Sequence, residues 1–412
     1  MNGKRWWNVS LLKDGIDSGT VVSTDQAVKH TIDGVTQTFR VYRIRTDQLY
    51  FNNHNDRIAT WLSQYRAEHD GRDPIDLPRD EYNAIIQKFI VDSNPEKIRG
   101  TQKNIAAFGQ RTPGVVLDDG LVIDGNRRLT CILRIAEQNH EIGWFEAAIL
   151  PDSISCEPKR IKLLELSIQH GEEGKLDYDP IERLVGVYND IIKDGLLTKA
   201  EYAKYTGTTE NEVQKLIDQA EYMEAFLDFC GAPEQYHLAR ELAIAGPLVE
   251  INSILNKTKS EGERQQVRDY IFANIIAQPE GDITRFIRKF KKVVGTPQAA
   301  DFYGEEQTAY QRLIAAMGEG QVTAARIRAI RSEDKLVSGF RNAMEKANQK
   351  VRLGKMANAP IAKSKEALAS LNQIMPSMLQ RMDWNDLEDL RNTLEAVERC
   401  TMRLIDEVDS LA

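Results

Sequence analysis

Two adjacent arginines follow a short apolar run and a glycine in the stretch "GLVIDGNRRLTCILRI", residues 120–135. The apolar run predicts a strand over residues 121–123, and the spacing of the apolar residues after it predicts a helix. Arg127 and Arg128 then stand in the first turn of that helix, where the backbone already carries a partial positive charge. Their placement costs roughly 0.3–1 kcal/mol each unless a negative charge compensates it.

The same turn offers further groups that an anion uses. Gly125 allows the backbone to approach a ligand closely, and the N–H groups of Asn126, Arg127 and Arg128 lack helical partners. Together with the two guanidinium groups, these donors predict a phosphate site. The alternative is that both arginines turn to solvent or pair with the nearby acids Asp118, Asp119 and Asp124.

The overall composition is that of a soluble globular protein, with 42% hydrophobic and 28% charged residues in 412. A net charge of −8 excludes a uniformly basic nucleic-acid coat but leaves room for local basic patches. The four cysteines lie far apart, and no histidine or cysteine spacing matches a metal-ligand set. We see no signal peptide and no run of about 18 apolar residues, so we expect a cytoplasmic protein without a membrane contact.

The order of the patterns predicts three domains: a mixed α/β domain over 1–155, a helical domain over 156–260 and a helical C-terminal domain over 261–412. In the first, "VVLDDGLVI" predicts a β-hairpin. Beyond residue 159 the pattern is almost wholly helical. A loop is expected around "MANAP", residues 356–360, before two last helices over about 362–381 and 384–411.

Three stretches resemble the conserved boxes of the ParB/sulfiredoxin superfamily. "VIDGNRR", residues 122–128, is similar to the second box, which lies between a strand and a helix. "LYFNNHNDRI" upstream is similar to the first box, with Asn55 and Arg57 in its Asn-x-Arg positions. "LLELSIQH", residues 163–170, resembles the third box, and "DPIER" after it resembles the start of the next helix. The resemblance covers about residues 40–225.

The resemblance implies a ParB/sulfiredoxin-like α+β domain, then a mainly helical region with a helix-turn-helix and a C-terminal helical hairpin or coiled coil. It also implies binding of a nucleoside triphosphate, CTP or ATP, with Mg²⁺. The predicted phosphate- or nucleotide-binding residues are Gly125, Asn126, Arg127, Arg128, Asn55 and Arg57. The predicted catalytic residues are Asp124, Glu165 and Gln169. The family has Glu, Asn and Arg where this chain has Leu166, Ser167 and His170, so the resemblance implies binding more directly than hydrolysis.

A helix-turn-helix pattern occupies "LLTKAEYAKYTGTTENEVQKLIDQA", residues 196–220. Gly207 is the expected turn, and Thr209 with Glu212 forms a capping box for the second helix. Thr209, Asn211 and Gln214 are the predicted DNA contacts, because amide side chains read base edges. Between residues 198 and 223, however, three basic residues face five acidic ones, so a packing role is the alternative.

Two later segments are basic. Residues 326–355 hold nine basic residues against three acidic ones, and "DITRFIRKFKKVVG" interleaves basic with apolar residues. Such stripes suit contact with a nucleic-acid backbone, and a solvated face or a face for a protein partner is the alternative. The predicted DNA contacts in these segments are Arg285, Arg288, Lys289, Lys292, Arg326, Arg328 and Arg331.

The last predicted helix repeats apolar residues three and four apart, which is a heptad seam. The seam consists of Leu387, Leu390, Leu394, Val397, Thr401, Leu404, Val408 and Leu411. It predicts either a homodimer through this helix or a hairpin with the preceding helix.

The leading functional hypothesis is a DNA-associated protein that binds a nucleotide or a nucleic-acid phosphate at the DGNRR turn and hydrolyses the nucleotide weakly, in DNA regulation, partition or phage defence. The first alternative is a metal-dependent nuclease, in which Asp124, Glu165, Glu172 or Glu173 holds the cation. The second is a non-catalytic subunit of a larger assembly.

Overall fold

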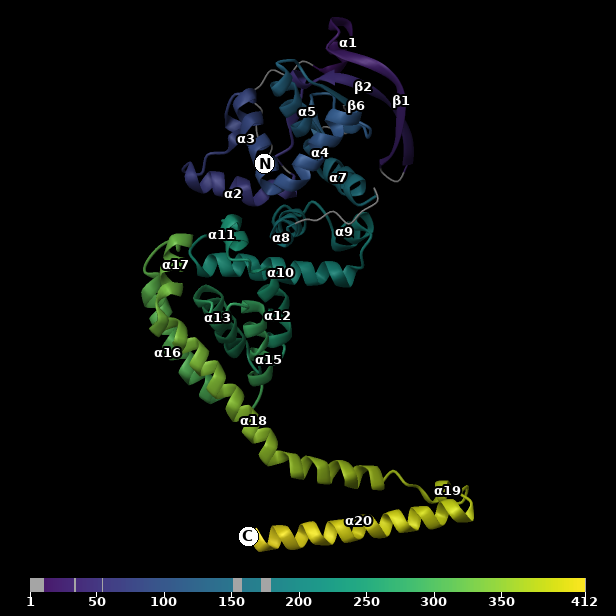
Figure 1. Ribbon diagram of the computed structural model, residues 1–412, viewed down its shortest axis with the longest axis vertical. Coiled ribbons are helices and arrows are strands. Elements are labelled where there is room, and N and C mark those ends of the chain that lie inside the picture. The colour runs from purple at the N-terminus through teal and green to yellow at the C-terminus, as the bar shows by residue number, and fades with distance from the viewer. Residues whose placement is uncertain (1–10, 33–34, 54, 151–157, 172–178, 412) are drawn as a thin grey trace. The chain divides into compact units, whose positions relative to one another are not determined.

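A computed structural model describes residues 11–32, 35–53, 55–150, 158–171 and 179–411 (Figure 1). The chain divides into two compact units, residues 1–345 and 346–412. Among the described residues, every helix is too short or too polar to cross a lipid bilayer.

The first unit begins with a six-stranded mixed sheet in the order β1-β2-β6-β4-β5-β3. The β1/β2, β2/β6 and β4/β5 pairs are antiparallel, and the β3/β5 and β4/β6 pairs are parallel. The predicted hairpin at "VVLDDGLVI" is confirmed as β4 and β5. The strands are β1 Val21–Ile32, β2 Val35–Arg45, β3 Tyr50–Phe51, β4 Gly114–Leu117, β5 Leu121–Asp124 and β6 Trp144–Leu150.

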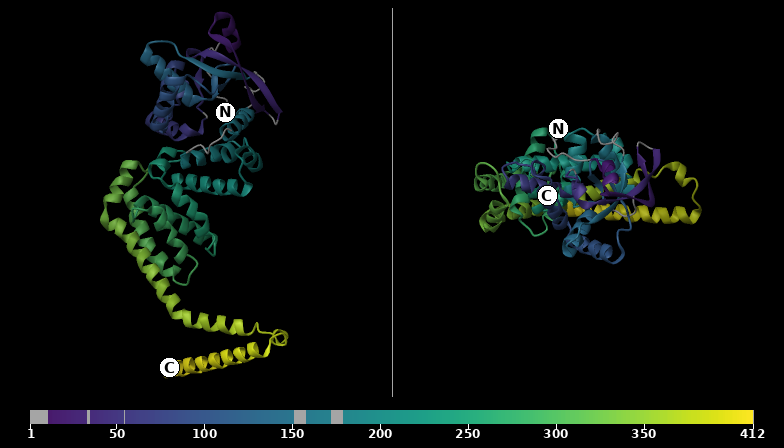
Figure 2. Two further views of the ribbon diagram at one scale, coloured as in Figure 1. Left: turned by 45° about the vertical axis from the view of Figure 1, so that its right-hand side comes forward. Right: turned by 90° about the horizontal axis from the view of Figure 1, so that it is seen from above.

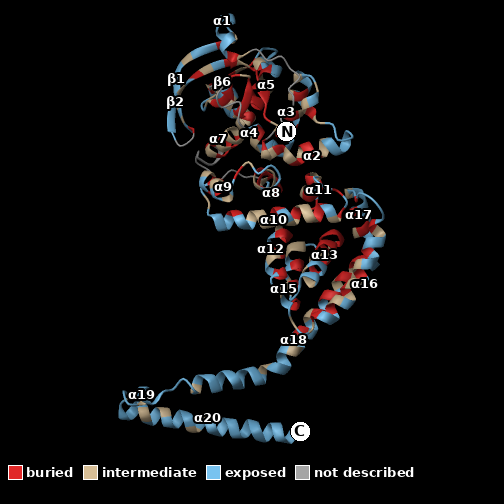
Figure 3. Cartoon of the chain, turned by 180° about the vertical axis from the view of Figure 1, so that it is seen from behind, coloured by how far each residue is buried: buried red, intermediate tan, exposed pale blue. Residues whose placement is uncertain are grey.

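Strands β4 and β5 form the centre of the domain's core. Every residue of β4 and the first three of β5 are buried, as expected for short apolar runs covered on both faces (Figure 3). Helices α3 and α4 contact α5, and α7 contacts β5. The helices and turns here are η1 Leu12–Asp14, α1 Gly15–Ser18, η2 Thr46–Gln48, η3 Asp56–Ile58, α2 Ala59–Glu68, η4 Pro74–Asp76, α3 Arg79–Ser93, α4 Pro95–Phe108, α5 Asn126–Asn139 and α7 Pro158–Gly171.

The far half of the β1–β2 hairpin is a two-stranded ribbon. Strand β2 pairs with β6 only over Val41–Arg45, so residues 27–32 and 35–40 pair only with one another. The ribbon curves towards α7, which contacts β1 (Figures 1 and 2). Ile32 is 7% exposed and belongs to the same core as Leu164 and Ile168 of α7. This apolar contact folds the ribbon over one side of the sheet.

From α7 onward the described chain is almost wholly helical, as predicted. The helices are α8 Pro180–Val187, the π-helix η5 Tyr188–Lys193, α9 Lys199–Thr206, α10 Glu210–Phe229, α11 Tyr236–Glu241, α12 Ala245–Leu255, α13 Glu261–Ala277, α14 Ile283–Arg288, α15 Phe290–Val293, α16 Ala299–Met317, α17 Ala324–Ser332 and α18 Asp334–Leu371.

The predicted helix-turn-helix pair is present as α9 and α10. Thr198 and Thr209 each form a capping box with the glutamate three residues later, and Gly207 ends α9 with φ +64°. Capping side chains satisfy first-turn N–H groups, which is why the sequence defines these helix ends so well.

The prediction of a loop around residues 356–360 is wrong. Helix α18 continues through these residues to Leu371 with Pro360 inside it. Proline removes one helical hydrogen bond, but the surrounding alanine and lysine residues are strong helix formers and the helix persists. The predicted helix over 362–381 is also wrong in its extent, since the short α19 Pro376–Leu379 begins at Pro376. Helix α20 Trp384–Leu411 matches the prediction.

Candidate phosphate-binding site

Two of the three boxes meet at one edge of the sheet. Strands β3 and β5 are parallel neighbours, with Tyr50 opposite Leu121 and Phe51 opposite Val122. The chain leaves β3 into residues 52–57 of the first box and leaves β5 into residues 124–128 of the second box. Because carboxyl ends of parallel strands share an edge, the two boxes lie side by side.

A hydrogen-bond relay through Asn126 joins these two boxes. The Asn52 N–H donates to Asn126 Oδ1 at 3.4 Å, and Asn126 Nδ2 donates to the Val122 carbonyl at 3.2 Å. The Asn126 side chain is 7% exposed. We conclude that Asn126 holds the loops together rather than offering its amide to a ligand.

Gly125 makes the turn between β5 and α5. Its φ is +97°, and a Cβ there would lie 2.8 Å from Phe145 Cζ, so glycine is required. Gly125 has no side chain to accept from the first-turn N–H groups of α5. These donors and the positive end of the helix dipole lie at the shared edge of β3 and β5.

Arg128 is partly compensated within the chain. Its Nη2 lies 2.5 Å from Asp124 Oδ2 and donates to the Pro113 carbonyl at 3.3 Å. The guanidinium group folds over Gly125, and its buried Nε has no hydrogen-bond partner. The alternative weighed for the arginines, pairing with a nearby acid, therefore holds for Arg128. Arg127 is half-buried at the preceding position of the turn.

The third box reaches the first through a buried lysine that sequence reasoning missed. Lys162 Nζ in α7 lies 2.9 Å from both carboxylate oxygens of Asp56, 3.3 Å from Asp190 Oδ2 and 4.0 Å from Glu165 Oε2. Burial disfavours the ammonium, but the three carboxylates raise the pKa of Lys162 well above its usual value. We call Lys162, Asp56, Asp190 and Glu165 the lysine cluster.

The lysine cluster also brings α8 and η5 to the site. A Cβ on Gly186 of α8 would lie 2.6 Å from Asp56 Oδ2, so the missing side chain permits the close approach. Asp190 lies in the π-helix η5. Pairing of Lys162 with Asp56 and Asp190 could not be found from sequence, because these residues are far apart along the chain.

The predicted catalytic residues occupy different surroundings. Asp124 pairs with Arg128, and Glu165 is 2% exposed and faces Lys162. Gln169 lies in α7, but its side chain and Glu172 and Glu173 lie outside the described residues. In the described part of the chain, no group of three histidine, cysteine or acidic residues is arranged to hold a metal ion.

His30 is a fourth contributor that the sequence did not reveal. It lies on the β1–β2 ribbon, with its ring tilted by 40° to that of Phe39 and the ring centroids 6.2 Å apart. Burial lowers the pKa of His30, and the negative charge of Asp124 opposes that shift. The folded-over ribbon therefore places an imidazole within electrostatic range of the second box. No local sequence pattern points to His30, since the ribbon reaches α7 only through the tertiary fold.

The remaining box residues are placed as follows. Asn55 is buried, and its Oδ1 accepts from the Arg57 N–H at 3.1 Å, which starts η3. Arg57 is half-buried in that turn. Both residues therefore lie in the loop that adjoins the second box.

A second buried polar group joins the sheet domain to the helices behind it. Thr60 Oγ1 donates to Glu182 Oε1 at 3.2 Å and accepts from Arg240 Nη1 at 2.7 Å. The Arg240 guanidinium also stacks 3.9 Å from the Trp61 ring centroid. Burial raises the pKa of Glu182 to about 8, so this carboxyl is largely protonated at neutral pH.

The predicted DNA contacts on α10 are exposed. Thr209 is occupied in capping, whereas Asn211 extends from the first turn. Gln214 Nε2 donates to Asp218 Oδ1 at 2.9 Å. Asp218 therefore competes for the Gln214 amide, which is one of the two amide side chains predicted to contact DNA bases.

The predicted basic contacts divide into engaged and open residues. Arg288 pairs with Glu250, Lys289 pairs with Glu280, and Arg326 and Arg331 donate to main-chain carbonyls. Three side chains are exposed and form neither an ion pair nor a hydrogen bond with the described residues. They are Arg285, Lys292 and Arg328.

Compared with family models, curated proteins and solved structures, the chain has no match in any of the three. The chemistry of the site is therefore inferred from the residues that build it.

The raised pKa of Glu182 gives a pH dependence of stability. The folded state holds a proton that the unfolded state releases near pH 4.5, so the stabilisation is complete below that value and is lost as pH rises through about 8. We expect the free energy of unfolding to fall by up to about 1.4 kcal/mol per pH unit in this window. Glu182→Gln, which keeps an acceptor for Thr60, should flatten this slope in urea unfolding.

Glu261→Gln serves as the control, because Glu261 is an exposed glutamate on α13. It should retain the wild-type slope. An unchanged slope in Glu182→Gln would show that Glu182 is not the titrating group.

Proposed function

We propose that this chain binds a nucleoside triphosphate, CTP or ATP, at the edge formed by β3 and β5. The observation that carries the proposal is the convergence of all three boxes there. Asn52 bonds to Asn126, and Asp56 pairs with Lys162, so segments distant in sequence are fixed around one helix start. This arrangement is what a resemblance to the ParB/sulfiredoxin superfamily implies.

In this proposal, the phosphates occupy the start of α5. The first-turn N–H groups and Arg127 bind the phosphate oxygens, and Arg128 turns from Asp124 towards them. Mg²⁺ enters with the triphosphate. Hydrolysis is not part of the proposal, because Asp124 and Glu165 face cationic partners within the chain.

Crosslinking with radiolabelled CTP and ATP tests the site. We expect Arg127→Ala and Arg128→Ala to weaken labelling about tenfold or more, since each removes a charge-assisted contact. Asp124→Asn should strengthen labelling, because it removes the carboxylate that competes for Arg128.

Arg134→Ala is the matched control. Arg134 lies on the same helix and donates to Gln102 Oε1 at 3.1 Å, away from the turn. Equal labelling of the wild type, Arg127→Ala and Arg128→Ala would refute the proposal.

DNA association is the second candidate, favoured by the open cations Arg285, Lys292 and Arg328. These side chains are exposed and lack an acidic partner among the described residues, so they are available to phosphates. The acidic residues around α10 make this helix a weaker choice for the main contact. We therefore assign the contact with the DNA backbone to Arg285, Lys292 and Arg328.

A gel shift over a salt series tests the DNA proposal. Replacing Arg285, Lys292 and Arg328 together by glutamine should weaken binding and lower the salt slope by up to about 3. Lys103, Arg111 and Lys259 replaced together provide a control with the same change in charge. A retarded band that neither salt nor the first triple variant affects would contradict this assignment.

For the C-terminal unit, we propose a homodimer through α20. This helix buries no residue, and Leu394, Leu404 and Val408 are 41%, 48% and 64% exposed. A hairpin would cover these side chains within the chain, so their exposure favours a second copy. The heptad spacing suits helix-to-helix packing of that kind.

Light scattering of the purified chain tests the dimer. We expect the wild type to be a dimer and Leu394→Glu to be a monomer, because a charge would enter the apolar seam. Asn392→Glu, two residues away and outside the seam, should remain a dimer. A monomeric wild type would reject the proposal.

A further inference from the structure

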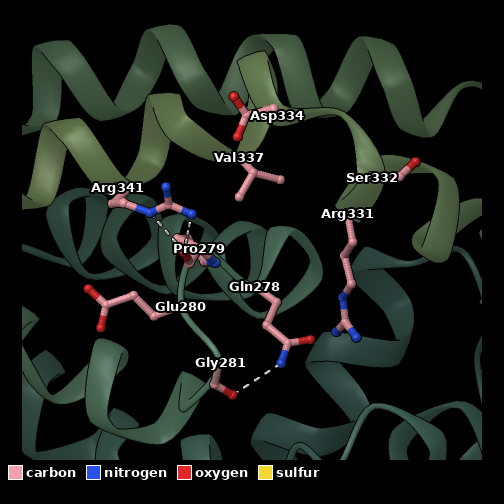
Figure 4. Close-up of a pocket in the computed structure, with 9 residues that line it drawn as sticks. All are labelled: Gln278, Pro279, Glu280, Gly281, Arg331, Ser332, Asp334, Val337 and Arg341. Carbon is pink, nitrogen blue, oxygen red and sulfur yellow. Dashed lines mark hydrogen bonds between the residues drawn. The ribbon is translucent and has the colours of Figure 1, made fainter.

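A concave polar site, separate from the sheet edge, lies at the carboxyl end of α13 in the helical part of the first unit. It is a cavity of about 500 Å³ (Figure 4). Three stretches line it: the connector 278–281 after α13, the end of α17, and the first two turns of α18. Arg331 and Arg341 flank it from α17 and α18.

Main-chain carbonyls hold both arginines in place. Arg331 donates to the carbonyls of Ile276 at 3.0 Å and Ile275 at 3.2 Å. Arg341 donates from Nε and Nη2 to the Pro279 carbonyl at 3.0 and 2.8 Å. A guanidinium has five N–H donors, so these bonds leave three donors on each arginine without a partner among the described residues.

The charge of the two arginines is not balanced locally. Neither guanidinium has a carboxylate within 4.0 Å in the described chain. Glu280 pairs with Lys289 instead. Asp334 is exposed, and its carboxylate lies beyond Val337 from Pro279 in the close-up (Figure 4).

The end of α13 offers the arginines only partial compensation. A helix carboxyl terminus carries about half a negative charge, against two full positive charges. Burial lowers the pKa of Arg331, which reflects the cost of holding this cation away from water. Arg331 and Arg341 are both half-buried and have no carboxylate partner among the described residues, so the cavity favours an anion.

We propose that this cavity binds a small phosphorylated molecule, which accepts hydrogen bonds from the free N–H groups of Arg341 on one side and of Arg331 on the other. A phosphate group suits a guanidinium fork, because its oxygens accept several charge-assisted hydrogen bonds at once. The two forks lie apart in the close-up, with Gln278 and Pro279 between them (Figure 4), so each contacts a different part of the ligand. The carbonyl contacts orient both forks before the ligand arrives, which reduces the ordering cost of binding. Val337 supplies an apolar wall for the rest of the molecule.

Calorimetric titration with inorganic phosphate and with a nucleoside monophosphate tests this site. The full-length Arg127→Ala variant is the background, because the proposed site at the sheet would also accept phosphate. We expect both ligands to bind, and Arg341→Gln and Arg331→Gln each to weaken binding of the nucleoside monophosphate about tenfold or more. Arg312→Gln, at an exposed position of α16, should bind as the background does.

Thermal unfolding without ligand separates binding from folding, since both arginines also support the end of α13. Arg341→Lys keeps the charge but loses the fork, and we expect it to fold and to bind phosphate more weakly. Equal affinity in all variants, or no binding by the background protein, would overturn the proposal. Binding of a short DNA duplex without binding of either small ligand would overturn the small-molecule assignment.

Discussion

The buried ammonium of Lys162 is the interaction on which the architecture of the sheet edge depends. It contacts Asp56 of the first box and Asp190 of the π-helix, and it extends from the helix that carries the third box. Breaking a buried ion pair by removing one partner usually costs several kcal/mol, because the other charge stays buried. The cluster thus fixes the loop after β3 against α7, and that loop in turn fixes Asn126 and the start of α5.

The sequence predicted helices, strands and turns well where the residues that determine them are close neighbours along the chain. The Asp-Asp-Gly hairpin, the capping threonines of α9 and α10, and the glycine before α5 each act within a few residues. The prediction failed at residues 356–360, where one proline was read as a helix end although the flanking residues favour a helix. The summed helix propensity of the residues around Pro360 outweighed the effect of this one helix-breaking residue.

The candidate site was only partly predictable for the same reason. The DGNRR turn is contiguous, so its donors could be read directly. The lysine cluster, the imidazole of His30 and the carbonyl contacts of Arg331 join residues that only the tertiary fold brings together. Arg331 also illustrates how a cation in a basic stripe can support a helix terminus, which charge counting alone does not reveal.

The pairing of Arg128 with Asp124 has a consequence for selectivity. The carboxylate is tethered four residues away, so its effective concentration at the guanidinium is high. A ligand that binds Arg128 at this turn must therefore displace the Asp124 carboxylate from the guanidinium group. Weak monovalent ions such as chloride or acetate offer no gain in the exchange, whereas a polyphosphate brings additional charges. Asp124 therefore competes with ligands for Arg128 and favours those that carry several negative charges.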